Sequence, residues 1–222
     1  MKRATVVIGA NFGDEGKGLM TDYFCSQLPS PPLVVRFNAG AQAGHTVVTP
    51  DGRRHVFHQA GSGSFLRVPT LLSRFFIVNP ILWEDERAQL VAHGLRPLLM
   101  VDRRARLTTP YDMLINQEVE QQRGNGRHGS CGVGINETVV RCATRFATTV
   151  DDLARMGVLR DKLEAIRKTY VPERLAQLGL EPSSFLQDCL ATTTFIDQFN
   201  SSLWAFLDSM VMVEDTAEIG AA

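Results

Sequence analysis

An apolar run followed at once by a glycine-rich turn constrains the fold of this chain most strongly. Ala4–Ile8 has the composition of a buried strand, and Gly13–Gly18 follows it as Gly-Asp-Glu-Gly-Lys-Gly. The apolar stretch Leu19–Leu28 then reads as a helix. A turn between a strand and a helix points backbone N–H groups and a helix N-terminus at one place, which favours an anion. The sequence therefore predicts a phosphate site, with Lys17 as an added positive charge.

Two carboxylates in this turn indicate chemistry beyond simple phosphate binding. Asp14 and Glu15 would repel a phosphate unless a metal ion or a proton transfer is involved. The turn also differs from the common P-loop, because Asn11 stands in place of the first glycine and Gly18 in place of the hydroxyl residue that holds magnesium. Asp14 is the candidate replacement for that hydroxyl. Glu15 has two possible roles: it could bind the metal ion, or its carboxylate could accept hydrogen bonds from N–H groups of the turn. The plainer alternative is a glycine-rich connection with solvated charges.

A second segment follows the turn along the chain. Val34–Phe37 reads as a buried strand, Asn38–Gly44 as a loop of small residues, and His45–Val48 as another apolar run. Together the two segments resemble the adenylosuccinate synthetase family, which joins IMP and aspartate using GTP. That family carries Trp-Gly-Asp-Glu-Gly-Lys-Gly, then Val-Val-Arg, then Asn-Ala-Gly-His-Thr. This chain has Phe12 for the Trp and Gln42 for the Asn, and the order and spacing agree.

The resemblance implies roles for residues of both segments. Asp14 is expected to be the base near N1 of IMP and, with the carbonyl of Gly44, a ligand of Mg²⁺. His45 is expected to donate hydrogen bonds to the transferring phosphoryl group and to act as general acid. The plainer role for His45 is a local hydrogen bond within a loop. The expected contacts of the GTP phosphates are Gly13, Glu15, Gly16, Lys17, Gly18 and Thr46, and those of IMP are Asn11, Gln42, Ala43, Cys131 and Arg141.

The resemblance continues more weakly to about Arg141. Pro110–Asp112 begins a polar helix like the one before the family's IMP loop, and Gly129–Ile135 stands where the family has Gly-Thr-Thr-Gly-Arg-Gly-Ile. Cys131 replaces a hydroxyl residue and Val133 replaces an arginine, so this loop loses a good donor and a charge. Arg141 stands at the place of an arginine that the family lends across a homodimer to the IMP phosphate of the neighbouring subunit.

Family members run well beyond 222 residues, so the resemblance also implies an incomplete family fold. Met210–Glu214 approaches the family's Phe-Glu-Gly-Ala-Gln-Gly segment, but the family's aspartate loop and its guanine-reading Lys-x-Asp element do not follow. Two classes of function stay open. One is a GTP-dependent ligase of purine biosynthesis, and the other is a truncated, non-catalytic nucleotide-binding remnant or dimerising module. A third reading is a viral-type ligase that acts on a guanine nucleotide; such relatives tend to carry Ser at the motif Asp, so Asp14 favours IMP.

Composition indicates an ordinary globular chain. Apolar residues make up 44% and charged residues 21% of the sequence, which is enough to build the core of one domain. The net charge of −1 argues against nucleic acid as a partner. No apolar run is long enough to span a bilayer. The four cysteines show no metal-ligand spacing and no signal peptide is visible, so we expect a cytoplasmic protein.

The alternation of predicted elements indicates an α/β fold with a central, mostly parallel sheet flanked by helices, similar to the P-loop NTPases. Strands are predicted at 4–9, 33–37, 54–58, 75–79 and 97–102, and helices at 18–28, 81–93, 110–122, 136–145 and 158–177. Asp51-Gly52 predicts a hairpin turn within 46–55, and a long helix is predicted over 195–212. Residues 1–150 are expected to form the nucleotide- and IMP-binding core, and 151–222 a mainly helical segment of the same domain.

Overall fold

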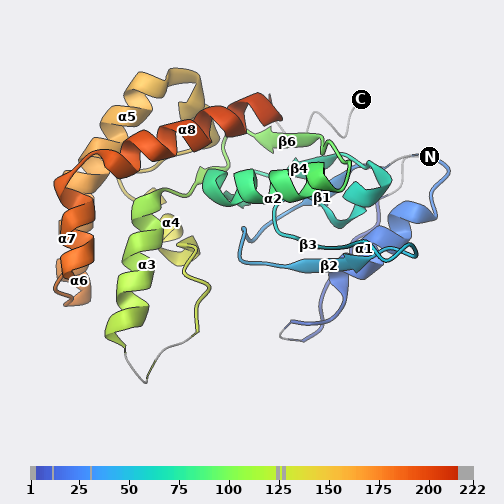
Figure 1. Cartoon of the computed structure of the whole chain (residues 1–222), viewed down its shortest axis with the longest axis horizontal. Coiled ribbons are helices and arrows are strands. Elements are labelled where there is room, and N and C mark those ends of the chain that lie inside the picture. The colour runs from blue at the N-terminus through green and yellow to red at the C-terminus, as the bar shows by residue number, and fades with distance from the viewer. Residues whose placement is uncertain (1–3, 12, 31, 124–125, 127–128, 215–222) are drawn as a thin grey trace.

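The fold is built around a four-stranded parallel β-sheet flanked by helices (Figure 1). This computed structural model describes residues 4–11, 13–30, 32–123, 126 and 129–214, so Phe12 and the sequence after Glu214 lie outside the described residues. The strand order is β1-β4-β6-β8, and each neighbouring pair is parallel. The strands are β1 (Val34–Arg36), β4 (Thr70–Leu72), β6 (Leu99–Asp102) and β8 (Met210–Val213). The predicted α/β class with a mostly parallel central sheet is confirmed.

Apolar side chains from the sheet and from two long helices form the core. α2 (Pro80–Ala92) and α8 (Thr194–Ser209) pack against each other beside the sheet (Figure 1). Leu72 and Leu99 of the sheet join Trp83 of α2 and Phe206 of α8 in one buried cluster, and burying each such side chain contributes about 1.5–3 kcal/mol. Trp83 Nε1 also donates a hydrogen bond to Ser209 Oγ at 2.8 Å. This bond holds the end of α8 against α2 where the chain passes into β8.

A β-hairpin lies below the sheet in Figure 1. Its strands are β2 (His45–Val48) and β3 (Arg54–Phe57), which pair antiparallel with His45 opposite Phe57. Gly52 has a φ of 85° in the connection, which is the left-handed conformation that an Asp-Gly turn requires. The predicted hairpin is therefore confirmed. A second, two-residue parallel pair joins β5 (Ile77–Val78) to β7 (Arg106–Leu107).

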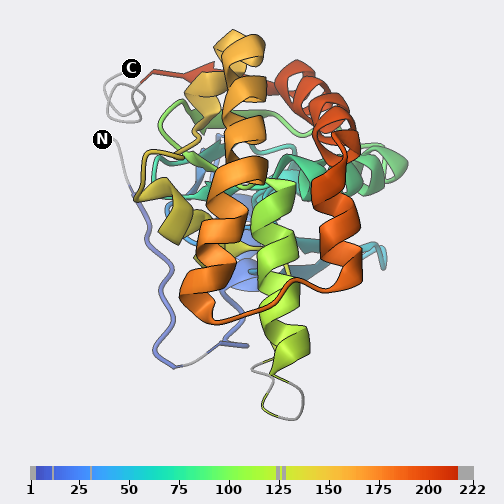
Figure 2. The same ribbon diagram turned by 90° about the vertical axis from the view of Figure 1, so that its left-hand side faces the viewer.

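The other α-helices that the structure describes are α1 (Lys17–Ser26), α3 (Pro110–Gln122), α4 (Ile135–Cys142), α5 (Met156–Ala165), α6 (Val171–Leu178) and α7 (Ser184–Ala191). A π-helical turn at Ile166–Tyr170 joins α5 to α6 in one continuous run. Figure 2 shows α3 between α6 and α7. Glu118 of α3 accepts hydrogen bonds from the N–H and the hydroxyl of Ser183, which caps α7. This contact ties the helical segment to the rest of the fold.

The predicted elements agree with the structure where the sequence pattern is long. Helices 18–28, 81–93, 110–122 and 136–145 correspond to α1 to α4, and 158–177 to the α5–α6 run. Strands 33–37, 54–58 and 97–102 are confirmed, and strand 75–79 shortens to β5. β4, β7 and α7 were not predicted. The helix predicted over 195–212 ends at Ser209, because Met210–Val213 enters the sheet beside β6 as β8.

The strand predicted at 4–9 is wrong. Residues 4–9 carry no strand, and the side chains of Val6 and Ile8 are each 80% exposed. An apolar, β-branched run becomes a strand only where a sheet edge accepts its backbone hydrogen bonds. The edges of the central sheet are β1 and β8, and among the described residues neither pairs with this segment. The run has the composition of a strand, but whether it pairs with a neighbouring strand depends on contacts between residues that are distant in the sequence.

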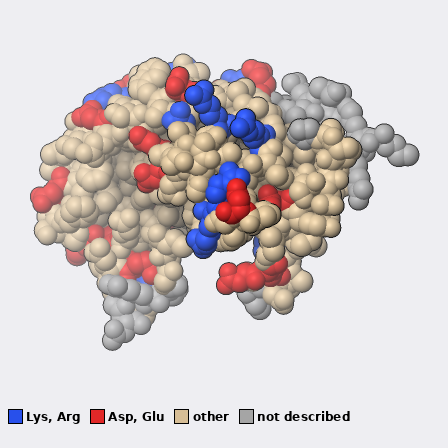
Figure 3. All heavy atoms as spheres, turned by 45° about the vertical axis from the view of Figure 1, so that its right-hand side comes forward, with Lys and Arg blue, Asp and Glu red and all other residues tan. Residues whose placement is uncertain are grey.

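The surface carries charges of both signs. Figure 3 shows basic and acidic side chains interspersed on one face, with a group of basic side chains near its middle. Ion pairs on the surface of the described residues include Arg103 with Asp151 and Arg53 with Asp51. Exposed pairs of this kind contribute little to stability. Within the described ranges, no helix has the length and apolar character needed to cross a membrane.

Candidate active site

The glycine-rich turn and the histidine segment lie side by side. α1 begins at Lys17 after Gly16, which adopts a left-handed conformation with φ of 70°. Gly18, the second residue of α1, is buried against β2. A Cβ atom built on it would lie 2.6 Å from the Cβ of His45. Only a glycine allows so close an approach. The contact between the two segments therefore depends on the absence of a side chain at position 18.

The carboxylate of Glu15 accepts hydrogen bonds from the backbone just before the turn. Its Oε1 accepts hydrogen bonds from the N–H groups of Ala10 and Asn11, the second at 2.6 Å, and its Oε2 lies 3.1 Å from Lys17 Nζ. The N–H of Asn11 and the ammonium of Lys17 hold the pKa of Glu15 below its ordinary value. Of the two roles considered for Glu15, the structure shows the acceptance of N–H groups. Its carboxylate therefore ties Lys17 to the backbone just before the turn.

Asp14 points into solvent beside this turn. It is exposed, has a left-handed φ of 51°, and its carboxylate has no partner among the described residues. The described residues also contain no group of three or more His, Cys, Asp or Glu side chains placed to hold a metal ion. Mg²⁺ commonly takes one or two carboxylates and completes its shell with nucleotide phosphates and water. The exposed carboxylate of Asp14 is the kind of ligand that such a site uses, and Gly44, the second expected ligand, is exposed in the loop before β2.

His45 begins β2 and is partly buried. Its Nδ1 lies 3.2 Å from Nη1 of Arg36, the last residue of β1. Burial, followed by the charges of Arg36, Lys17 and His58, lowers the pKa of His45 to about 4. The imidazole is therefore neutral near pH 7. The neutral ring keeps one N–H group that can donate a hydrogen bond, and the role of His45 as general acid stays a prediction.

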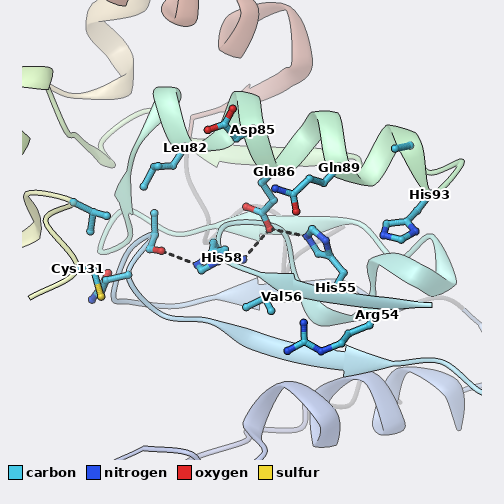
Figure 4. A pocket seen from close by; sticks show the side chains of 14 residues that line it. Arg54, His55, Val56, His58, Leu82, Asp85, Glu86, Gln89, His93 and Cys131 are labelled. Carbon is cyan, nitrogen blue, oxygen red and sulfur yellow. Dashed lines mark hydrogen bonds and ion pairs between the residues drawn. The ribbon is translucent and has the colours of Figure 1, made fainter. Parts of the chain in front are cut away.

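Gln42 and Cys131, two of the predicted IMP contacts, line the same cavity of about 540 Å³. The cavity lies between β3, α2 and the loop that carries Cys131 (Figure 4). On the α2 side, Glu86 accepts hydrogen bonds from the N–H groups of His58 at 2.8 Å and Gln59 at 2.7 Å. These bonds fix the end of β3 against α2. The cavity wall is thus held by a buried carboxylate that sequence analysis did not single out.

Arg141 lies inside the fold. Its side chain is fully buried, and all five of its N–H donors are used. Nε and Nη2 hold the carboxylate of Asp112 at 2.8 Å each, and the remaining donors reach Phe146 O, Thr148 Oγ1 and Leu107 O. A guanidinium in this position has no free donor for the phosphate of another subunit. We therefore leave Arg141 out of the proposed IMP site.

The other predicted contacts lie around the two segments. Asn11, Gly13, Gly16 and Thr46 are exposed, and Ala43 is partly buried. Arg36, the last residue of β1, is not among the predicted site residues, and it is only 6% exposed. The signal that could have identified it is its position at the end of a buried strand, directly before the loop that leads to His45.

Comparisons with known proteins point to one family. A family model described as adenylosuccinate synthetase matches residues 6–217. The adenylosuccinate synthetase of Synechococcus sp. (strain RCC307) is 37% identical over 179 residues, which are 80% of this chain and 40% of that protein. The adenylosuccinate synthetase of Picrophilus torridus is 33% identical over 162 residues, which are 73% of this chain and 38% of that protein.

The fold is also similar to a solved structure. The fully ligated adenylosuccinate synthetase of Plasmodium falciparum superimposes with a TM-score of 0.59 and 17% identity, over 92% of this chain and 49% of that one. The chain therefore spans about 40% of the length of these curated relatives. On the match of the family model over 6–217, together with this identity to curated relatives, the chain belongs to the adenylosuccinate synthetase family.

Proposed function

We propose that this chain provides the phosphoryl-transfer site of an adenylosuccinate synthetase. The proposed reaction phosphorylates the 6-oxygen of IMP with GTP, after which the amine of L-aspartate displaces the phosphate. The observation that supports it best is the contact between Gly18 and His45, since it joins the turn that carries Asp14 and Lys17 to the imidazole. A phosphoryl group between these residues would meet a carboxylate, an ammonium and an N–H donor.

Each residue has a distinct task in this proposal. Asp14 takes the proton from N1 of IMP, so that O6 gains the electron density it needs to attack phosphorus. Lys17 and the N–H groups of the turn hold phosphate oxygens. His45 donates its ring N–H to the transferring group and stabilises the charge that develops there. Asp14 and the carbonyl of Gly44 would hold Mg²⁺, which neutralises charge on the β- and γ-phosphates when bound.

The remaining parts of the proposal come from the family. IMP, GTP and L-aspartate are proposed as the substrates of the whole protein, and a homodimer as its assembly. Gln42, Ala43, Asn11 and Cys131 are proposed contacts of IMP. Contacts with the guanine base and with aspartate are not assigned to residues of this chain. The non-catalytic alternative predicts nucleotide binding without formation of adenylosuccinate, so a product assay with GTP, IMP and aspartate separates it from the ligase. Replacing IMP by a guanine nucleotide in the same assay tests the viral-type reading.

Replacing Lys17 by Met should weaken the binding of GTP with Mg²⁺ by about tenfold, because a charge-assisted hydrogen bond to phosphate is lost. Lys162→Met is a matched control, since the Lys162 side chain is also 35% exposed and also pairs with a carboxylate, that of Asp152. Isothermal titration of both variants measures the effect. Equal affinities for wild type, Lys17→Met and Lys162→Met would contradict the phosphate site.

Replacing Glu15 by Gln should strengthen the binding of GTP with Mg²⁺. Because the carboxylate of Glu15 pairs with Lys17 at 3.1 Å, a phosphate that binds Lys17 has to compete with it. Gln carries no charge to pair with the ammonium, so the substitution weakens this competition and should raise the affinity by up to about tenfold. Glu164→Gln is the control, since Glu164 also pairs with basic side chains, Arg167 and Lys168. Weaker binding by Glu15→Gln than by wild type would instead mean that this carboxylate assists the nucleotide.

A further inference from the structure

Side chains of α3 hold the segment 129–134, which leads into α4. Asn116 holds it at two points, since its Nδ2 donates a hydrogen bond to Ser130 Oγ at 3.0 Å and its Oδ1 accepts the N–H of Gly134 at 3.2 Å. Asn116 is half-buried, so these bonds are partly shielded from water. One amide therefore links the beginning and the end of the segment to α3.

Gln117 and Glu120 add further contacts between α3 and this segment. Gln117 Nε2 donates a hydrogen bond to the carbonyl of Gly132 at 3.2 Å. Glu120 Oε2 accepts the N–H of Gly129 at 3.1 Å and the N–H of Ser130 at 3.4 Å. The segment is thus attached to α3 near its beginning, in its middle and at its end.

The residues of the segment alternate between α3 and the cavity. Every second residue from Ser130 to Gly134 contacts α3. Cys131 and Val133, which stand between them, line the cavity that Gln42 also lines (Figure 4). A shift of the segment by one position would turn residues that now contact α3 toward the cavity. The hydrogen bonds to α3 therefore determine which side chains face it.

The glycines of the segment make it adaptable unless something outside it fixes its conformation. Gly132 and Gly134 have φ of 66° and 76°, which is the left-handed conformation. Ordering a glycine costs more backbone entropy than ordering any other residue. At Gly134 a Cβ atom would lie 2.7 Å from the backbone carbon of Asp112, so this close approach to α3 also requires glycine. The segment therefore depends on contacts with α3 to keep one conformation.

The segment also meets the loop 38–44, which carries Gln42. A Cβ atom built on Gly40 would lie 2.5 Å from Cδ1 of Ile135, the residue that follows the segment. Because two parts of the cavity wall touch here, a displaced segment would change the distance between Cys131 and Gln42.

We propose that Asn116 is a positioning residue for IMP, which holds the segment 129–134 so that Cys131 and Gln42 face the same ligand. Among the described residues that line the cavity, none belongs to α3, so Asn116 acts from behind the segment and does not touch IMP. This inference rests on the proposed function, because IMP is the ligand proposed for Cys131 and Gln42.

Replacing Asn116 by Leu removes both hydrogen bonds but keeps a side chain of similar size. If the segment then has its binding conformation in about one molecule of ten, the affinity for IMP falls about tenfold. The turn at Gly13–Gly18 is built by other elements, so the affinity for GTP with Mg²⁺ should not change. Asn116→Asp should restore most of the IMP affinity, because a carboxylate can accept both the N–H of Gly134 and the hydroxyl of Ser130.

Isothermal titration of the whole chain with IMP, and separately with GTP and Mg²⁺, measures these affinities. Gln122→Leu is a matched control on the same helix. The amide of Gln122 also makes two hydrogen bonds, to Glu118 and to the carbonyl of Glu181, and neither partner lies in the segment. Gln122→Leu should therefore keep the wild-type affinity for IMP. Denaturant unfolding of each variant measures its stability alongside.

Alkylation of Cys131 gives a second readout. Cys131 is an exposed free thiol, so iodoacetamide can modify it, and mass spectrometry of the peptide measures the extent. At an IMP concentration equal to the wild-type dissociation constant, IMP should protect about half of the wild-type molecules and about a tenth of Asn116→Leu.

Equal IMP affinities for wild type and Asn116→Leu would overturn the inference. A parallel loss of IMP affinity, GTP affinity and stability would also overturn it, since that pattern indicates a structural role only. If Asn116→Leu does not fold, Ser130→Ala removes one of the two hydrogen bonds from the segment and should weaken IMP binding about fivefold.

The same titrations separate this inference from the proposed function. A wild-type chain that binds GTP with Mg²⁺ but no IMP would contradict the proposed IMP site, and the inference with it. Failure of the proposed function is thus seen in wild type, whereas failure of the inference alone is seen when the variant binds IMP as wild type does.

Discussion

Arg141→Met should lower the free energy of unfolding by about 3–5 kcal/mol, because it leaves the carboxylate of Asp112 buried without its partner. Both side chains are fully buried, and the guanidinium also holds the carbonyl groups of Leu107 and Phe146. Denaturant unfolding monitored by circular dichroism measures the change. Arg160→Met is the control, since its ion pair with Asp197 is exposed on both sides and its loss should cost much less.

A second variant separates loss of the charge pair from loss of packing. Replacing Asp112 by Leu in the Arg141→Met background removes the unpaired carboxylate, and a buried pair replaced by apolar residues is often tolerated. Recovery should be incomplete, because Asp112 also accepts the N–H and hydroxyl of Thr109 at the start of α3. If Arg141→Met were instead as stable as wild type and bound IMP more weakly, Arg141 would belong to the IMP site after all.

Local signals predicted α3 well. Thr109 and Asp112 form a capping box, and Pro110 occupies the first turn of the helix. Four adjacent residues therefore indicate where α3 begins. β4 shows the opposite case. Thr70–Leu72 is a three-residue strand, buried along its length, without the alternation that identifies a half-buried strand. Its place in the sheet depends on β1 and β6, which lie far away in the sequence.

In the candidate site, too, some features can be predicted from local sequence and others depend on the fold. The motifs at Gly13–Gly18 and His45 can be predicted from sequence because the residue types and their order are unusual together. The buried pairing of Arg36 with His45 could not be, since it depends on how β1 and β2 lie in space. Arg141 illustrates the limit of carrying a role over by position: the matching residue is present, but its surroundings give it five internal hydrogen bonds.

Gly18→Ala should lower the free energy of unfolding by about 1–3 kcal/mol, the usual range for overpacking a buried site. Helix propensity alone predicts the opposite, because alanine is favoured over glycine inside a helix by about 1 kcal/mol. The added Cβ would meet His45 at 2.6 Å from its Cβ and 3.0 Å from its Cα, so β2 has to move. Since the contact includes backbone atoms, a change of side-chain rotamer cannot relieve it.

Gly157→Ala offers a closely matched control for that variant. Gly157 is the second residue of α5 as Gly18 is the second residue of α1, and a Cβ at position 157 meets nothing within 4 Å. We expect Gly157→Ala to be neutral or to stabilise the chain, so the two variants should change the unfolding midpoint in opposite directions. Gly18→Ala should also weaken the binding of GTP with Mg²⁺, because the turn and His45 are pushed apart. Equal or greater stability of Gly18→Ala would show that the glycine turn and β2 are not in close contact, and the proposed convergence of Asp14, Lys17 and His45 would lose its structural basis.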